Sequence, residues 1–290
     1  ALWYPCDAAE TSFPTGLYEF SVAKNAPALQ KAFPLILMSH GSGGTRYGHC
    51  KTAEFLARQG YIVLAPEHPG NNFFDDSKSG TADSYQNRSR HIIAALHYLL
   101  DHQDKYSLEI DREKIGVFGF SLGGFTALCC VGAKPDVSAL SRHIKTNREF
   151  DPLFTSYQVV VRDGVTEGYL DTAQDELFKF CIALAPVSGG MFSTKESLAG
   201  VKAPVLLFRA ERDMVLRDPF HAREIKDNLS TSCEYHITKK AGHFSYLSPA
   251  RTDIDVPLGE FATDNDDFNR QAEHDRLHQL VACFLEKSLS

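Results

Sequence analysis

The sequence has no apolar stretch that could cross a bilayer as a helix, and it has no surplus of positive charge. Its apolar runs, such as 33–38 and 180–186, are far shorter than the roughly 20 residues that a membrane-spanning helix needs. Lys and Arg number 30 against 37 Asp and Glu, which gives a net charge of −7 at pH 7. Proteins that bind nucleic acids gather basic residues on one face to neutralise phosphates. We therefore expect neither an integral membrane segment nor a nucleic-acid partner.

The sequence also lacks the residue spacings by which metals and phosphates are commonly bound. The cysteines include no CxxC pair, and the 12 histidines include no HExxH pattern. The glycine-rich runs lack the following lysine and threonine of a phosphate-binding loop. Seven cysteines, two of them adjacent at 129 and 130, do not indicate a paired disulfide framework. We expect neither a metal nor another cofactor.

The chain begins at Ala1 rather than at Met, from which we expect that a preceding segment has been removed. The pattern leaves open whether the protein stays in the cytoplasm or is exported after loss of a signal peptide. Hydrophobic residues make up 43% of the chain, which is enough to bury a sizeable core. The whole chain, 1–290, is therefore predicted to form a single domain of a soluble protein, whose oligomeric state the sequence does not indicate.

Short apolar runs alternate with amphipathic stretches along most of the chain, which predicts an α/β fold with a mostly parallel sheet flanked by helices. Between residues 133 and 176 the interval is too long for a plain crossover and predicts an inserted cap. The expected strands are 33–39, 61–65, 115–120, 180–185, 204–208 and 233–237. The expected helices are 51–59, 85–102, 123–131 and 267–287.

One motif predicts a nucleophile. The segment Gly119-Phe120-Ser121-Leu122-Gly123 lies between an expected strand and an expected helix, which is the context of a nucleophile elbow in the α/β-hydrolase fold. The glycines remove side chains that would collide with neighbouring elements around a strained serine. The turn raises the Ser121 hydroxyl to the carboxyl edge of the sheet, where open α/β folds bind their ligands.

A serine nucleophile needs a base and an acid, which follow it in this fold in the order Ser, acid, His. His243 follows the last expected strand and is predicted to be the base. Asp213, in the loop after the strand at 204–208, is predicted to orient His243, with Glu211 and Asp218 as alternatives. The other helix-borne histidines, at 221, 274 and 278, are expected to be solvated.

The negative charge that forms on an ester carbonyl oxygen needs hydrogen-bond donors, which are often backbone N–H groups. One is expected from Leu122, directly after the nucleophile. The second is expected from Ser42, with Gly43 as the alternative, in the run His40-Gly41-Ser42-Gly43-Gly44 after the first clear strand. Substrate-binding positions are expected in the same region of the sheet edge, at His40, Gly41, Gly43 and His68, although His40 also suits an anchor for the loop.

The chain resembles the dienelactone-hydrolase-like and platelet-activating-factor-acetylhydrolase-like branch of the α/β-hydrolases. The matching segments are Trp3-Tyr4-Pro5, Ser39 to Gly44, Glu67-His68-Pro69-Gly70, Gly119 to Gly124 and Gly242-His243-Phe244. The resemblance implies hydrolysis of carboxylic esters with small acyl groups and an oxyanion N–H from the residue after His40-Gly41. True dienelactone hydrolases carry a cysteine where this chain has Ser121.

The residues and the resemblance together predict a serine esterase that acts on a small-molecule ester through an acyl-enzyme on Ser121. The same groups would also serve a peptidase, a thioesterase or an acyltransferase. An inactive binding scaffold is the alternative of a different class.

Overall fold

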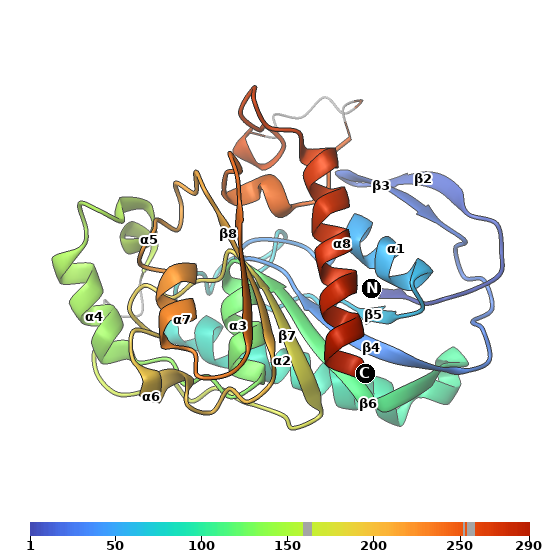
Figure 1. Cartoon of the computed structure of the whole chain (residues 1–290), viewed down its shortest axis with the longest axis horizontal. Coiled ribbons are helices and arrows are strands. Elements are labelled where there is room, and N and C mark those ends of the chain that lie inside the picture. Colours follow the sequence, from blue (N-terminus) through green and yellow to red (C-terminus); the bar gives the residue numbers. More distant parts are fainter. Residues whose placement is uncertain (159–163, 252, 254–258) are drawn as a thin grey trace.

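A seven-stranded sheet forms the centre of the protein in the computed structural model, which describes residues 1–158, 164–251, 253 and 259–290 (Figure 1). The strand order is β1-β5-β4-β6-β7-β8-β9, and every neighbouring pair is parallel except β1 with β5. The predicted, mostly parallel sheet is confirmed. The strands are β1 (Leu2–Trp3), β4 (Ala32–Ser39), β5 (Ile62–Leu64), β6 (Glu109–Phe120), β7 (Phe178–Leu184), β8 (Val205–Ala210) and β9 (Cys233–Thr238).

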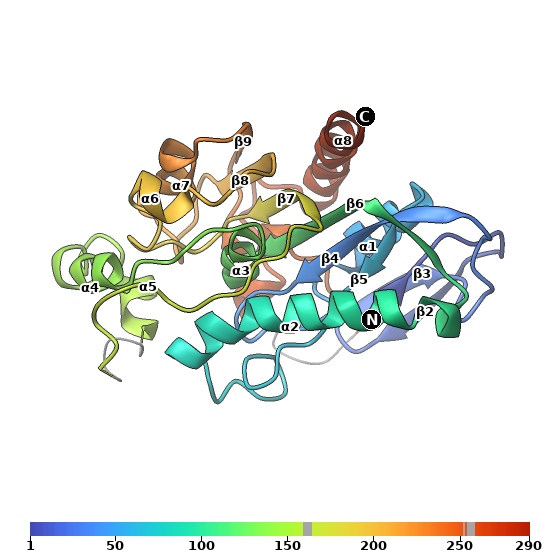
Figure 2. The same cartoon turned by 90° about the horizontal axis from the view of Figure 1, so that it is seen from below.

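Helices cover both faces of this sheet. In Figure 2, α2 runs along one face and α8 lies against the other. Across the described residues, none of the helices is both apolar enough and long enough to span a bilayer. The helices are α1 (Cys50–Arg58), α2 (Ala82–Asp101), α3 (Leu122–Cys130), α4 (Val137–Thr146), α5 (Pro152–Tyr157), α6 (Lys195–Leu198), α7 (Ala222–Asn228) and α8 (Arg270–Leu289), with short 3-10 turns at Gln103–Tyr106, His243–Tyr246 and Gly259–Phe261.

The two faces of the sheet bury separate apolar clusters, which explains why the central strands are continuously apolar where helices cover both of their faces. In β4, Leu35 and Leu37 pack into the cluster with α2 and α3, whereas Ile36 and Met38 pack into the cluster with α1 and α8. Side chains alternate between faces along a strand, so a strand covered on both sides has no polar face. Burial of each such side chain contributes about 1.5–3 kcal/mol before the entropy of ordering is subtracted.

The candidate site lies where the strand order reverses. From β4 the chain proceeds to β5 on one side and then crosses to β6 on the other, where Ser39 of β4 pairs with Gly119 of β6. The loops that follow β4, β5, β6, β8 and β9 all leave the same carboxyl edge of the sheet. Ligands of open α/β sheets bind at such a switch point. This topology brings the predicted residues, which are far apart in sequence, to one edge.

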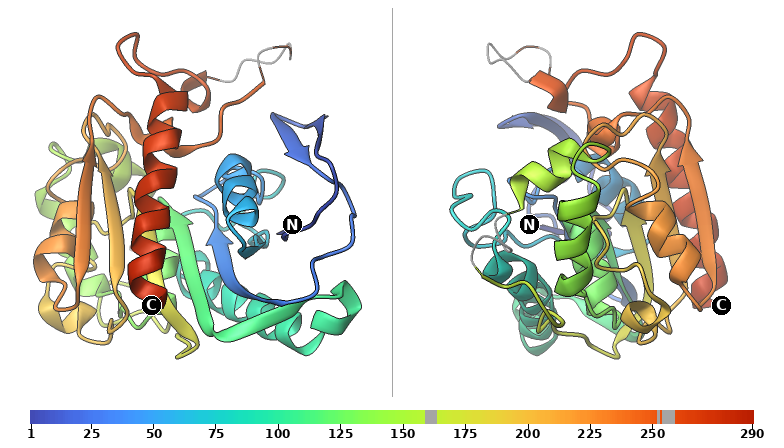
Figure 3. Two further views of the ribbon diagram at one scale, coloured as in Figure 1. Left: turned by 45° about the vertical axis from the view of Figure 1, so that its right-hand side comes forward. Right: turned by 90° about the vertical axis from the view of Figure 1, so that its left-hand side faces the viewer.

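A hairpin that the sequence did not predict lies near the N-terminus. Strands β2 (Thr11–Thr15) and β3 (Tyr18–Val22) pair with each other, separately from the main sheet, and Gly16 turns between them with a φ of 57°. The left view of Figure 3 shows this hairpin arching over the N-terminal segment. Pro14 within β2 obscured the strand pattern, because proline cannot donate a hydrogen bond to a sheet.

The interval predicted to be a cap contains α4 and α5, which lie at the end of the molecule opposite the hairpin (Figure 1). Residues 159–163 of this interval lie outside the described residues.

Asp151 joins the interval to the rest of the protein. Its Oδ2 accepts hydrogen bonds of 2.9 Å from Nε2 of His143 in α4 and from Nε2 of His221 before α7. Burial raises the pKa of Asp151, but the two histidine hydrogen bonds outweigh burial and lower it to about 2. That the interval acts as a cap remains a prediction.

The expectation that the helix-borne histidines are solvated was wrong for His221 and His274, whereas His278 is partly exposed. His221 is buried and accepts a hydrogen bond from the Ser188 N–H at Nδ1. His274 is buried with its Nε2 3.0 Å from the Leu247 carbonyl, and His278 stacks on Phe55. An imidazole can be buried when one of its nitrogens has a hydrogen-bond partner. The position of a histidine on a helix therefore does not determine how exposed its side chain is.

A carboxyl group with an unusual ionisation lies next to the Asp151 cluster. Glu224 Oε2 accepts hydrogen bonds from the Ser188 hydroxyl and, at 3.1 Å, from the Gly190 N–H. Burial raises the pKa of Glu224 to about 7 despite these donors. The folded protein therefore favours the protonated form more strongly than the unfolded chain does.

We predict that Glu224 makes the protein less stable as the pH rises. A carboxyl whose pKa is raised by folding contributes stability below its unfolded pKa and loses it as the pH rises through the folded pKa. The Glu224→Gln variant has no carboxyl to ionise and lacks this loss. Its free energy of unfolding, relative to that of the native protein, should therefore increase by up to about 3 kcal/mol between about pH 4.5 and pH 8. Urea unfolding at several pH values measures the difference, in which the other titrating groups cancel. A difference that stays constant over this range would contradict the prediction.

Candidate active site

Ser121 occupies a sharp turn between β6 and α3. Its φ of 56° and ψ of −120° are a conformation that residues with a side chain rarely adopt. The Ser121 N–H donates to the Leu184 carbonyl of β7 at 2.9 Å, and the Ser121 carbonyl accepts from the N–H groups of Gly124 and Val187. These hydrogen bonds hold the strained turn against the sheet.

The two glycines of the motif allow backbone to pack directly on backbone. A Cβ on Gly119 would lie 1.9 Å from the Gly123 carbonyl oxygen, and a Cβ on Gly123 would lie 1.9 Å from the Ser39 carbonyl oxygen. Neither contact is possible for a real side chain. The close approach brings the end of β4 against the start of α3, and the loop after β4 thus lies beside the serine.

His243 connects the serine to an acid. Its Nε2 is 3.0 Å from Ser121 Oγ, and its Nδ1 is 2.7 Å from Asp213 Oδ2. Asp213 and His243 come from the loops after β8 and β9, which are neighbouring parallel strands. An ionised carboxylate only accepts, so Nδ1 donates to Asp213 and Nε2 accepts from the Ser121 hydroxyl. Both side chains are buried, and the ring of Phe120 lies 4.9 Å from the imidazole, centroid to centroid.

Asp213 is itself held by the backbone. Its Oδ1 accepts from the N–H groups of Val215 at 2.9 Å and Leu216 at 2.7 Å, which leaves Oδ2 directed at His243. The two alternatives are engaged elsewhere: Glu211 accepts from Lys239 and the Lys240 N–H, and Asp218 pairs with Arg209. The structure therefore brings Asp213, rather than Glu211 or Asp218, to the histidine.

The backbone N–H groups of Ser42 and Leu122, next to the serine, have no acceptor in the described part of the chain, and neither has the N–H of Gly43, the alternative to Ser42. Leu122 is the first residue of α3, where helix N–H groups have no intrahelical partner and the helix dipole favours negative charge. The glycine-rich loop, residues 40–44, passes close by, because a Cβ on Gly41 would lie 3.4 Å from the Ser121 Cβ. Gly43 has a φ of 62°, which turns the loop at the next residue.

His40 and His68 are buried behind the glycine-rich loop. His40 Nδ1 is 2.8 Å from the Gly41 carbonyl, and its Nε2 accepts from the His68 N–H at 3.2 Å and lies 3.3 Å from Glu67 Oε2. Burial, reinforced by nearby Arg88, lowers the pKa of both imidazoles. His68 is 0% exposed and its Nε2 is 2.9 Å from Ser39 Oγ. Neither ring offers free surface in this conformation, and their contact with a substrate remains a prediction.

Arg88 of α2 is a buried residue that the sequence analysis did not single out. Its guanidinium donates to Asn71 Oδ1 at 2.6 Å, to Thr126 Oγ1 at 3.2 Å and to the His40 carbonyl. The signal was present in the sequence. Arg88 falls on the apolar stripe of its helix, three residues after Tyr85 and four before Ile92, where a charge is unexpected.

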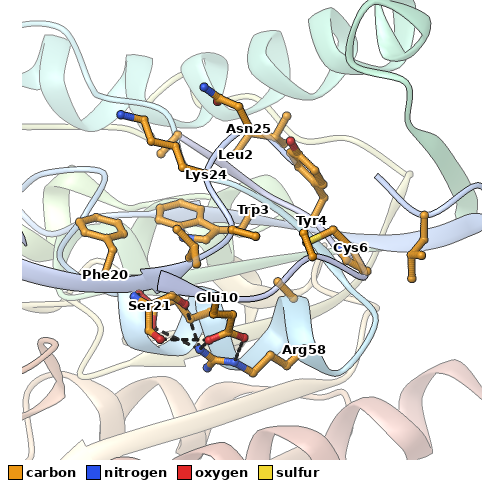
Figure 4. Close-up of a pocket in the computed structure, with 18 of the residues that line it drawn as sticks. Leu2, Trp3, Tyr4, Cys6, Glu10, Phe20, Ser21, Lys24, Asn25 and Arg58 are labelled. Atoms are coloured by element: carbon orange, nitrogen blue, oxygen red, sulfur yellow. Dashed lines mark hydrogen bonds and ion pairs between the residues drawn. The ribbon is translucent and has the colours of Figure 1, made fainter. Parts of the chain in front are cut away.

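Among the described residues, no group of three His, Cys, Asp or Glu side chains is arranged to hold a metal ion. A cavity of about 760 Å³ lies between the N-terminal segment and the β2–β3 hairpin, where Trp3 and Phe20 lie side by side and Arg58 bonds to Glu10 (Figure 4). None of the predicted site residues lines this cavity.

Comparison with known proteins identifies the class of the molecule. Residues 36–253 match the family described as the alpha/beta hydrolase family. Since the match covers most of the chain, the protein belongs to the alpha/beta hydrolase family, and the fold predicted from its motifs is confirmed.

Two cutinases of Thermobifida alba are similar to part of the chain. Cutinase est1 and cutinase est2 are each 28% identical to it over 114 residues. The matching residues make up 39% of this chain and 35% of each cutinase, so the chain matches about a third of the length of these relatives.

We predict that Gly123→Ala destabilises the protein by at least about 2 kcal/mol, because the new methyl group overlaps the Ser39 carbonyl. Alanine has a higher helix propensity than glycine, which by itself would stabilise the protein by about 1 kcal/mol. The predicted destabilisation is the net effect after this gain is subtracted. Urea unfolding measures the change. Gly242→Ala is the control, since its Cβ would have the Ser245 hydroxyl, 3.9 Å away, as its nearest neighbour. Equal stability of the two variants would rule out the close backbone contact.

Proposed function

We propose that the protein is a serine esterase that cleaves small-molecule carboxylic esters through an acyl-enzyme on Ser121. The observation that carries the proposal is the continuous chain from Ser121 Oγ through His243 to Asp213, with separations of 3.0 Å and 2.7 Å. A serine hydroxyl is a weak nucleophile unless a base takes its proton as it attacks. The strained turn at Ser121 and the two acceptor-free N–H groups beside it complete the requirements of acyl transfer.

In the proposed mechanism, Ser121 Oγ attacks the ester carbonyl while His243 Nε2 takes the hydroxyl proton. The N–H groups of Leu122 and Ser42, with Gly43 as the alternative to Ser42, donate to the carbonyl oxygen as it becomes negative. His243 then gives the proton to the leaving alcohol, and the acyl group stays on Ser121. A water molecule then attacks the acyl carbonyl while His243 takes a proton from it, and His243 returns that proton to Ser121 Oγ as the bond to the acyl group breaks and the acid leaves. Asp213 keeps the imidazole in the tautomer with its proton on Nδ1 and stabilises its protonated form.

The predicted substrate-binding residues have two roles in this proposal. Gly41 and Gly43 leave room for the ester next to the serine, because neither has a side chain. His40 and His68 support the glycine-rich loop from behind and touch the substrate only if the loop moves.

The comparisons favour an ester over other acyl substrates, because the chain resembles two cutinases, which are esterases. Membership of the dienelactone-hydrolase-like and platelet-activating-factor-acetylhydrolase-like branch, and a small acyl group with it, rests on the motifs at 3–5, 39–44, 67–70, 119–124 and 242–244 and stays a prediction.

Hydrolysis of p-nitrophenyl esters from acetate to dodecanoate tests the proposal. The native protein should hydrolyse the shorter esters best, and Ser121→Ala should lower kcat by at least about 10³-fold, because the nucleophile is gone. Ser193→Ala, at an exposed serine away from the site, is the matched control and should retain full activity.

Labelling by a fluorophosphonate separates the remaining classes. A native protein that labels at Ser121 but hydrolyses no ester of the series would be a peptidase, a thioesterase or an acyltransferase. A native protein that neither hydrolyses nor labels would be an inactive scaffold, and the proposed function would fall.

We further predict that Asp213→Asn lowers kcat by about 10²- to 10⁴-fold with little change in KM, because an amide favours the wrong imidazole tautomer. Glu211→Gln and Asp218→Asn are matched controls that remove a carboxylate from the same loop region. Both should retain activity within about threefold, as substitutions outside the site usually do. If Asp213→Asn were fully active and one of the controls lost activity, the acid would be the residue replaced in that control and not Asp213.

A further inference from the structure

Arg88 is buried at 1% exposure, and among the described residues no carboxylate bonds to it directly; Asp76 is linked to it only through Asn71, which donates to Asp76 Oδ1 at 2.6 Å. Its acceptors are all neutral: the His40 carbonyl, Ser39 Oγ, the side chain and carbonyl of Asn71, and Thr126 Oγ1. Burial lowers the pKa of Arg88 to about 9, so the guanidinium is charged at neutral pH. A buried charge without an ionic partner is costly to a fold, and a hydrophobic side chain would serve packing alone at lower cost.

The acceptors of Arg88 lie on both sides of Gly41. On one side the guanidinium donates directly to the His40 carbonyl. On the other side it donates to Asn71 Oδ1 at 2.6 Å, and Asn71 Nδ2 donates in turn to Ser42 Oγ at 2.9 Å. The glycine-rich loop is therefore held before and after the residue that lies next to Ser121.

The same guanidinium also reaches the helix that follows the nucleophile. Its Nε donates to Thr126 Oγ1 at 3.2 Å, and the Thr126 hydroxyl donates to the Leu122 carbonyl at 2.8 Å. Leu122 and Ser42 carry the two N–H groups to which the proposed mechanism assigns the oxyanion. Arg88 thus connects the two donor-bearing segments, which come from loops after different strands, through one rigid planar group.

His40 completes the support of the loop. The Gly41 carbonyl faces His40 Nδ1 at 2.8 Å and the Gly44 N–H at 3.1 Å. Because a trans peptide directs its carbonyl and its N–H to opposite sides, these bonds turn the Ser42 N–H away from His40. Arg88 fixes the preceding peptide through the His40 carbonyl, so that two successive peptides of the loop have defined orientations.

We propose that Arg88 is a positioning residue that holds the Ser42 and Leu122 N–H groups in place for the oxyanion. It does so through hydrogen bonds to the loop on both sides of Gly41 and through its hydrogen bond to Thr126. The inference rests on the proposed function, because it concerns the oxyanion of that reaction. Donors aligned in advance stabilise the transition state without reorganisation, and a displacement of about 1 Å can cost about 10²-fold in rate.

The test compares Arg88→Met, which removes the charge and the donors, with Arg88→Lys, which keeps the charge but not the fork of donors. Arg90→Met is the matched control, because Arg90 lies in the same helix and its guanidinium bonds to the exposed Asp171. Hydrolysis of p-nitrophenyl acetate is measured per active site, and the sites are counted by fluorophosphonate labelling. We expect kcat per labelled site to fall about 10- to 100-fold in Arg88→Met with KM within about threefold, to recover in part in Arg88→Lys, and to stay unchanged in Arg90→Met.

A second readout separates positioning from a purely structural role. A trifluoromethyl ketone forms a tetrahedral adduct whose oxyanion occupies the same donors, so its affinity should fall in Arg88→Met by the same factor as kcat/KM. If Arg88→Met fails to fold, Arg88→Lys and Asn71→Ala carry the test, since Asn71→Ala releases Ser42 while the His40 carbonyl keeps its partner.

Each outcome decides the inference. Native kcat per labelled site and native ketone affinity in the folded Arg88 variants would overturn it and would leave the proposed esterase intact. A native protein that neither labels at Ser121 nor turns over esters would overturn the proposed function, and this inference would fall with it.

Discussion

The backbone of Ser121, held at a φ of 56°, is the constraint on which the rest of the site depends. Such a conformation costs of order 1–3 kcal/mol and persists only where the surroundings enforce it. Here β7 accepts the Ser121 N–H, and glycines at 119 and 123 let the turn press against the end of β4. The same close contact sets the distance between the serine and the glycine-rich loop. A larger residue at either glycine would therefore change the spacing of the whole site.

The carboxyl edge of the sheet is built from hydrogen bonds, in contrast to the apolar clusters on its two faces. His40, His68, Asn71 and Arg88 are all buried there, and each has hydrogen-bond partners among the loops after β4 and β5 or on α3. Such groups add less to stability than hydrocarbon of the same volume, but they fix direction. The protein thus combines a core that supplies stability with an edge that supplies orientation.

The elements of the sheet could be predicted because two-sided burial makes the buried stretches of its strands continuously apolar, as in 35–38 of β4, 115–120 of β6 and 180–184 of β7. The Ser121 motif stood out because its glycines mark a strand-to-helix turn. Asp213 was predicted from its place after the strand at 204–208, but setting aside Glu211 and Asp218 needed the fold, which shows that Asp213 faces His243. Arg88 was overlooked because its partners, His40, Asn71 and Thr126, are distant in sequence. His221 and His274 were misjudged because their burial depends on loops that pack over them, which helical periodicity does not describe.

The order of elements along the chain has a consequence for how this protein can change its choice of substrate. The serine precedes the interval that contains α4 and α5, while the acid and the base both follow it, on the adjacent strands β8 and β9. None of the three belongs to the interval, and their alignment is fixed by the pairing of β6, β7, β8 and β9. Changes of length between α3 and β7 therefore leave the strands that position Ser121, Asp213 and His243 in register. Under the proposed function, the interval can therefore vary and change the choice of ester while the hydrogen-bonded chain from Ser121 to Asp213 is kept.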